Sequence, residues 1–277
     1  MKKIIGIVCA ISLLAAISMA SGCASTRYYK DTNAEQALAE EQFNLAVAYA
    51  QGKGAPQDYA QAVEWLRKAA EQGHVEARFN LAVAYAQGKG VPQDYFKATE
   101  WYRKAAEQGH PIAQGALGDA YRLGYGVAKD EAQAVKWFQK SAVQGNAEAQ
   151  RALGDAYEYG AGGLAKDERK AVEWWQKAAE QGHPIAQNIV GDAYRLGIGV
   201  AKDEKLANEW FSKAIPGLRN MAEQGHAEAQ YRLAGSLQKD GAAKDEAQAV
   251  EWLKKAAAQG YAPAQAMLNQ MKQDGRL

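Results

Sequence analysis

The chain repeats itself, and this repetition restricts its possible folds more than any other feature. The string "AVAYAQGKGAPQDY" at residues 46–59 returns 36 residues later, at 82–95, with one residue changed. The string "EQG", or a close variant, ends at Gly73, Gly109, Gly145, Gly182, Gly225 and Gly260. The spacings are therefore 36, 36, 37, 43 and 35 residues. A period of this length indicates stacked supersecondary units that bury a core only together.

Each unit divides into two helical halves. In the second unit, Ala77, Leu81 and Tyr85 recur every four residues, which places them on one face of a helix. The glycines of "AQGKG" follow and favour the left-handed conformation that ends a helix. A second apolar stripe, with Ala98 and Tyr102, predicts the second helix. The pattern predicts an antiparallel helix pair in every unit.

Capping residues mark where these helices begin. Asp precedes every second helix, at Asp58, Asp94, Asp130, Asp167, Asp203 and Asp245. Gln follows three residues later at Gln61, Gln133 and Gln248, which predicts capping boxes. Thr32 and Glu35 predict a further capping box at the start of the first helix.

The repeated motif is A-x-x-x-L-x-x-x-Y-x-x-G-x-G-V/A-x-x-D-x-x-x-A-x-x-W, followed by "KAAEQG". It resembles the Sel-one-like repeat (SLR) family, a relative of the tetratricopeptide repeat, over about 240 of 277 residues. The resemblance implies an all-α fold, a right-handed α/α superhelical solenoid that acts as a protein-interaction scaffold. The six predicted repeats cover 37–73, 74–109, 110–145, 146–182, 183–225 and 226–260, and a capping helix covers 261–275, within a solenoid of residues 32–277.

The first 22 residues are typical of a bacterial export signal. Lys2 and Lys3 precede a short apolar stretch, and "ASGC" at residues 20–23 resembles a lipobox. We therefore expect Cys23 to be lipidated and residues 23–31 to form a flexible tether. Ala24 after the Cys implies an outer-membrane lipoprotein, on its periplasmic or surface side. The alternative is ordinary cleavage after Ala20, which releases a soluble secreted or periplasmic protein.

Composition excludes some classes of partner. The chain has 33 basic and 32 acidic residues, and this balance lacks the basic footprint of a nucleic-acid binder. With the signal removed, Cys23 is the only cysteine, so packing must supply the stability. We expect no nucleic acid, no cofactor, and contact with a membrane only through the lipid.

Two aromatic series each keep one position in the repeat. Six of the seven tryptophans share a position, Trp65, Trp101, Trp137, Trp174, Trp210 and Trp252, and we interpret them as packing residues between repeats. A glycan-binding or host-interaction role for this Trp ladder is the alternative. The histidines His74, His110, His183 and His226 occupy the starts of first helices. One histidine per repeat is badly placed to converge on a metal, so no metal site is expected.

One catalytic motif occurs. "SLQK" at Ser236 to Lys239 matches the S-x-x-K of serine β-lactamases, but neither S-D-N nor K-T-G accompanies it. Ser236 replaces an alanine at a helix-packing position of other units. We interpret the match as chance and expect no enzyme; a β-lactamase-like or peptidoglycan-active enzyme is the remaining alternative.

The positions that vary within the constant frame predict a binding groove. In tetratricopeptide-like stacks the first helix of each pair lines the concave face. On this basis the N-terminal end is apolar, with Phe43, Val47, Gln51, Phe79, Val83 and Gln87. The middle is charged, with Asp119, Arg122, Arg151, Asp155, Glu158, Asp192 and Arg195. The sixth repeat contributes Tyr231 and Lys239. We expect a protein or peptide partner there, although the charges could also pair locally on a solvated face.

The period fails between Trp210 and Gly225, where seven residues are inserted at 215–221. Pro216 lacks an N–H and Gly217 has low helix propensity, so we expect a break or kink near Pro216. Leu218 and Met221 should pack inward beyond it, and a notch should open beside Tyr231 and Lys239. A neutral insertion on the convex side is the alternative.

Overall fold

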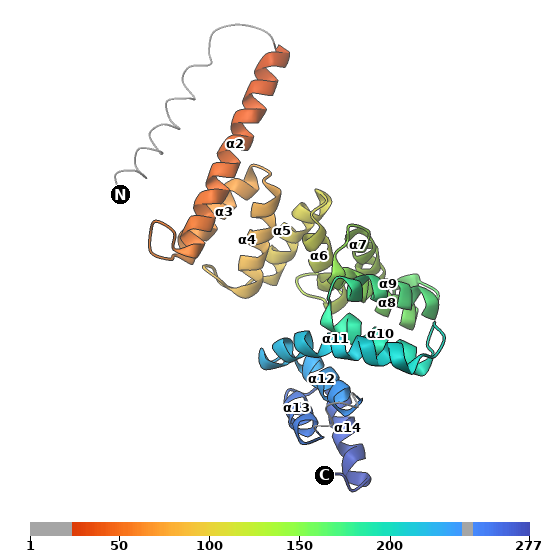
Figure 1. Ribbon diagram of the computed structural model, residues 1–277. Helices are drawn as coiled ribbons and strands as arrows, with labels where there is room; N and C mark the ends of the chain where they lie inside the picture. Colours follow the sequence, from red (N-terminus) through yellow and green to blue (C-terminus); the bar gives the residue numbers. More distant parts are fainter. Residues whose placement is uncertain (1–23, 240–245) are drawn as a thin grey trace. The chain divides into compact units, whose positions relative to one another are not determined.

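The structure, a computed structural model, describes residues 24–239 and 246–277 (Figure 1). In these ranges the chain forms thirteen α-helices, one short 3-10 helix and no strand. The all-α solenoid predicted from the sequence is confirmed. Of the described helices, none is both long and apolar enough to cross a membrane. Cys23 and the predicted signal lie outside the described residues.

Ten of the helices have the same length of 13 residues. The exceptions are α2 with 28 residues, α11 with 20 and α14 with 12. In chain order the helices are α2 (Ala24–Gln51), α3 (Tyr59–Glu71), α4 (Val75–Gln87), α5 (Tyr95–Glu107), α6 (Pro111–Leu123), α7 (Glu131–Val143), α8 (Ala147–Tyr159), η1 (Ala161–Gly163), α9 (Glu168–Glu180), α10 (Pro184–Leu196), α11 (Glu204–Glu223), α12 (Ala227–Lys239), α13 (Glu246–Ala258) and α14 (Ala262–Gln273). The last of these is the predicted capping helix.

The chain divides into two compact units, one ending at Leu81 and the other beginning at Ala82. In the first, α2 packs against α3, and the buried residues include Ala46 and Leu66. Helix α2 begins at Ala24, which differs from the predicted tether and from the predicted start at Thr32. Residues 24–31 contain neither Pro nor Gly, so no residue there opposes the extension of the helix toward the N-terminus.

In the second unit the helices pack in chain order. Helix α6 packs against α7, α8 against α9, α10 against α11, and α12 against α13. Each second helix also contacts the first helix of the next pair, as α7 contacts α8 and α9 contacts α10. Every pair therefore buries its apolar faces against both neighbours, as a solenoid requires.

The capping signals act as predicted. The carboxylates of Asp58, Asp94, Asp130, Asp167 and Asp203 accept hydrogen bonds from backbone N–H groups in the first turn of the second helices. The position of Asp245 lies outside the described residues. First helices end in left-handed glycines, with φ of 79° at Gly124 and 74° at Gly197. These caps set the helix length because they satisfy terminal N–H groups and turn the chain at fixed positions.

A relay of glutamine side chains, which the sequence pattern did not indicate, joins successive pairs. Gln114 donates to the carbonyl of Ala106 at 3.1 Å, and Gln144 donates to the Gln114 side chain at 2.7 Å. The same arrangement recurs one unit later with Gln150 and Gln181. Gln114 and Gln150, on the first helices, thus satisfy carbonyls near the ends of the preceding second helices. The glutamines of the "EQG" signature, Gln144 and Gln181, hold those two side chains in place.

The expected break at Pro216 is wrong: α11 continues through it from Glu204 to Glu223. A proline inside a helix costs about 3 kcal/mol, so burial must offset the loss. Leu218 is fully buried, and Met221 packs against the same cluster, as predicted. Gly217 provides room for Pro184, because a Cβ at this glycine would lie 2.4 Å from the Pro184 Cγ.

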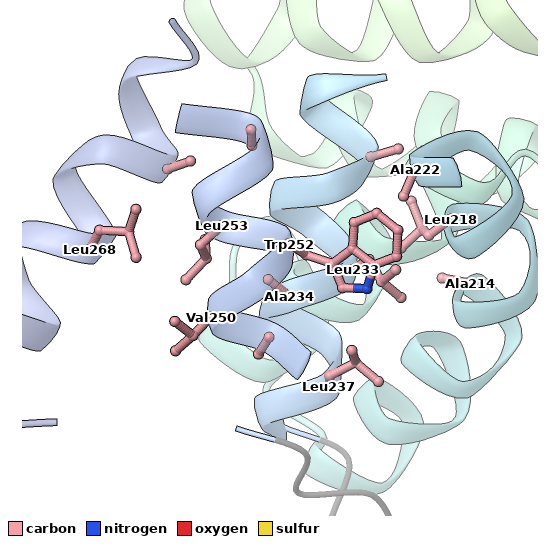
Figure 2. Close-up of a cluster of buried hydrophobic side chains, with 14 of the residues drawn as sticks. Ala214, Leu218, Ala222, Leu233, Ala234, Leu237, Val250, Trp252, Leu253 and Leu268 are labelled. Atoms are coloured by element: carbon pink, nitrogen blue, oxygen red, sulfur yellow. The ribbon is translucent and has the colours of Figure 1, made fainter. Parts of the chain in front are cut away.

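The largest buried cluster joins α11 to the three helices that follow (Figure 2). Leu218 from the inserted residues lies in it with Leu233 and Leu253, and the Trp252 indole packs among them. The seven inserted residues add nearly two turns of helix. The insertion therefore extends the core between the fifth and sixth repeats.

Candidate functional site

A groove of about 730 Å³ lies within the second unit and is lined by residues of α6 to α10, α12 and their loops. We call it the central groove. It brings together seven of the predicted groove residues: Arg122, Arg151, Asp155, Glu158, Asp192, Arg195 and Tyr231. Further lining residues not anticipated from the sequence include Tyr159, Trp175, Glu228, Arg232 and Tyr261. Its volume is typical of a binding cleft.

A chain of polar contacts includes the groove-lining residues Arg151, Asp155 and Trp175 and extends beyond the groove to Glu148 and His183. Arg151 bridges Glu148 at 2.6 Å and Asp155 at 2.5 Å on its own helix. Trp175 donates its indole N–H to the other Asp155 oxygen at 2.9 Å. His183 approaches Glu148 at 2.7 Å, so the contacts cross from α8 to the next pair. Arg151 is only 13% exposed, and its guanidinium is held by carboxylates on both sides.

The electrostatics of this chain follow from its contacts. Burial disfavours the charged form of Glu148. The hydrogen bond with His183 and the Arg151 guanidinium outweigh this effect of burial, and together they lower the pKa of Glu148 to about 2. Asp155 differs, because burial raises its pKa despite the charge of Arg151 and the hydrogen bond from Trp175. The two carboxylates on one arginine therefore have opposite shifts.

The other guanidinium groups of the groove are also ion-paired. Arg122 contacts Asp119 at 2.6 Å, and Arg195 contacts Asp192 at 2.7 Å, both between residues three apart. The predicted local pairing is thus present. Arg232 contacts Glu228 at 2.8 Å. Asp119 itself lies outside the lining of the groove.

Arg232 leads into a buried polar network. Its guanidinium donates to the Asn188 side-chain carbonyl at 3.1 Å, and Asn188 donates to the Ser236 hydroxyl at 2.8 Å. Ser236 is fully buried. A buried hydroxyl that accepts from an amide is placed to hold helices together rather than to attack a substrate. The side chain of Lys239 is not among those described.

Three aromatic rings of the second helices pack closely against glycines of the first helices. Gly118, Gly154 and Gly191 on the first helices face Phe138, Trp175 and Phe211 on the second. A Cβ at these glycines would lie 2.4 to 2.7 Å from the ring atoms. The first, second and sixth repeats have alanine at the position of the glycine, and the residues opposite are Leu66, Tyr102 and Leu253. The three repeats that carry "GD" are therefore the three with a close-packed aromatic ring. Of their aspartates, Asp155 and Asp192 line the groove and Asp119 does not.

The predicted apolar end of the groove is divided between the two units of the chain. In the first unit, Phe43 is half-buried and stacks on the His74 ring, with centroids 4.6 Å apart. His74 in turn contacts Glu40 at 2.9 Å. Val47 and Phe79 are half-buried and Gln51 is exposed. Val83 and Gln87, in the second unit, do not line the central groove.

The tryptophan series is half-buried, except for Trp252, which is buried. A lysine three residues later lies over each of the six rings, 3.9 to 4.4 Å from the centroid. The spacing W-x-x-K was present in the sequence and could have indicated these cation–π contacts. One face of each indole is thus already occupied by a lysine of the same helix.

The histidines serve as helix caps. The Nδ1 atoms of His74, His110 and His183 accept from backbone N–H groups three residues later, and Asn146 accepts in the same way in the fourth unit. Within the described residues, no three His, Cys, Asp or Glu side chains gather as a metal would require. The capping contact explains why Asn replaces His in this series.

Comparison with known proteins agrees with this geometry. The Sel1 repeat matches at 42–74, 75–110, 111–146, 147–183, 184–215 and 227–261, and the interval before the last match contains most of the insertion. A protective antigen of uropathogenic Escherichia coli strains, which displays an SLR fold, is 38% identical with a TM-score of 0.63. The alignment covers 86% of this chain but 50% of the antigen, so the chain spans half the length of that relative.

A Sel1 repeat protein from Oxalobacter formigenes is 31% identical with a TM-score of 0.67, over 81% of this chain and 86% of that one. No curated protein sequence matches. The six matched repeats cover well over half of the chain and coincide with its helix pairs. The chain therefore belongs to the Sel1 repeat family.

Proposed function

We propose that this protein is a non-catalytic scaffold that binds a segment of a partner protein in the central groove. Sel1 repeat proteins are generally protein-interaction scaffolds, and the family is generally non-catalytic. The observation that carries the proposal is the construction of the groove. Its side chains are positioned by ion pairs and hydrogen bonds, so little side-chain entropy remains to be lost when a ligand binds.

The second part of the proposal concerns location. A basic n-region, a short apolar stretch and "ASGC" at residues 20–23 support export and lipidation of Cys23. The scaffold would then work at the outer membrane, held there by lipid. This proposal rests on the sequence, because these residues lie outside the described part of the chain.

Photo-crosslinking tests the groove. A photoreactive phenylalanine analogue replaces Tyr159, which lines the groove and is 77% exposed. The control carries the same analogue at Val143, which is 72% exposed on α7 and outside the lining. Irradiation of the cell envelope should give an adduct from position 159 that position 143 does not give. Equal adducts from both positions, or none from position 159, would contradict the proposal.

A further inference from the structure

We infer that the central groove, if it is the partner site proposed above, recognises a basic side chain flanked by apolar residues. The ligand would be a peptide segment with Lys or Arg at its centre. This deepens the proposed function by specifying the chemistry of the partner, and it rests on that function.

The first argument is the charge of the groove. Among the described residues, five carboxylates, four guanidinium groups and no lysine line it. Every one of the four guanidinium groups is already ion-paired, and Arg151 is paired twice. Glu131 and Glu158 have no ion-pair partner within the described part of the chain. An incoming anion would compete with existing pairs, whereas an incoming cation finds carboxylates that are not neutralised.

Glu158 is the stronger of the two positions. It is half-buried in the groove, one turn from Asp155 on α8. Burial raises the pKa of Glu158, and the charge of Asp155 adds to the rise. A hydrogen bond with Tyr159 and the charges of Arg232 and Lys166 act on this pKa in the opposite direction. The net shift is upward, as expected for a half-buried carboxylate that has no cation of the described ranges in direct contact. A bound ammonium or guanidinium group would supply that compensation.

The second argument is an apolar rim. Leu123, Tyr159 and Leu196 end the first helices of three consecutive pairs and are 45%, 77% and 61% exposed. Tyr159 and Leu196 line the groove, and Leu123 directly follows the lining residue Arg122. The first two repeats have glutamine at this position, Gln51 and Gln87. Single exposed apolar residues are common, but three at one repeat position form a systematic feature. The rim occurs in the third, fourth and fifth repeats, which also carry four of the five lining acids, Glu131, Asp155, Glu158 and Asp192.

Charge and rim together define the ligand. The rim offers apolar contacts at the ends of three successive helices, and Glu158 lies directly beside the rim residue Tyr159. Tyr159 can also face a bound cation with its ring. A peptide that places a basic residue between apolar ones would satisfy both features, whereas an acidic peptide would meet Glu158, a carboxylate with no ion-pair partner among the described residues.

Selection from a phage-displayed library of random 12-residue peptides, at physiological salt, tests the inference. Peptides are selected on the protein and then counter-selected on the double variant Tyr159→Ser, Leu196→Ser, to keep those that need the groove. The retained peptides should be enriched in Lys or Arg flanked by apolar residues. Retained peptides that are neutral or acidic would overturn the inference and leave the proposed function standing. No groove-dependent peptide at all would overturn both.

Charge removal gives an independent readout on the selected peptides. Glu158→Gln should weaken their binding about fivefold, the effect of one partly exposed ion pair. Glu173→Gln, on the exposed face of α9 outside the lining, removes the same charge and should leave affinity unchanged. Equal affinity of the two variants would overturn the assignment of Glu158. Circular dichroism checks that both variants remain helical.

Discussion

The Trp175 indole packs against the backbone of Gly154, where a Cβ would lie 2.4 Å from the ring. The same ring donates its N–H to Asp155, the next residue. One glycine therefore allows an aromatic ring to approach the first helix and to hold a groove acid in place. The equivalent contacts in the neighbouring pairs involve Gly118 with Phe138 and Gly191 with Phe211.

This contact predicts a compensating pair of substitutions. Gly154→Ala should lower the free energy of unfolding by about 1–3 kcal/mol, because the added methyl overpacks against the ring. Adding Trp175→Leu restores the Ala and Leu combination of the first and sixth units and should recover part of the loss. Urea denaturation of the single and double variants measures the coupling. Strictly additive effects would contradict the contact.

Gly115→Ala is the matched control on the neighbouring first helix. A Cβ there would meet its nearest atom, the Ser141 hydroxyl oxygen, at 3.4 Å, which is ordinary contact. Because alanine favours helix over glycine by about 1 kcal/mol, this variant should be neutral or more stable. A loss equal to that of Gly154→Ala would show that any added methyl is harmful in these helices.

Glu148 predicts a dependence of stability on pH. Its pKa is lowered from 4.5 to about 2, so its contribution is fully present above pH 4.5 and is lost as the pH falls toward 2. The side chain is 54% exposed, and solvent screening reduces the expected contribution to about 1 kcal/mol. Glu148→Gln should therefore be less stable than the parent protein at pH 7, and the difference should shrink at pH 3.

His183→Asn separates the two contacts of this histidine. Asn146 shows that an asparagine can accept the capping N–H, so the cap should survive while the contact with Glu148 is lost. The variant should lose part of the Glu148 contribution at pH 7. If the free energies of unfolding of Glu148→Gln and the parent protein differ by the same amount at pH 7 and at pH 3, the stabilising role assigned to Glu148 is contradicted.

Adjacent residues of α11 predict opposite effects. Pro216 is exposed, so Pro216→Ala should stabilise the protein by up to about 3 kcal/mol, since it restores an N–H and removes a poor helix former. Gly217→Ala should destabilise it, because the new Cβ would lie 2.4 Å from the ring of Pro184. Thermal unfolding of the two variants measures both. Two changes of the same sign would show that the helix or its packing differs from this arrangement.

Lipidation of Cys23 predicts a change in partition. Cys23→Ala should move the protein from the detergent phase to the aqueous phase, because the acyl chains supply the membrane affinity. Ser21→Ala, which leaves the cysteine in place, is the control. An unchanged distribution of the Cys23 variant would remove the lipoprotein proposal and favour cleavage after Ala20.

The sequence by itself determined the helix pairs, their lengths and the order in which they stack. These features rest on local rules: apolar spacing, an Asp before each second helix and glycines after each first helix. The caps at Asp94 and Asp130 and the left-handed Gly124 occur where those rules placed them. The same rules failed at Pro216, because local propensity does not register the buried Leu218 two residues later.

Tertiary structure alone decided which polar groups meet between helices. Arg151 could pair with an acid on either side of it, and the helix allows both, while His183 reaches Glu148 from 35 residues away. The Asn188 to Ser236 bond spans 48 residues. Such partners depend on how neighbouring helices pack, and no local sequence pattern specifies that packing. Short-range propensity determines the helix pair of each repeat. The groove and its polar contacts form only when the repeats stack.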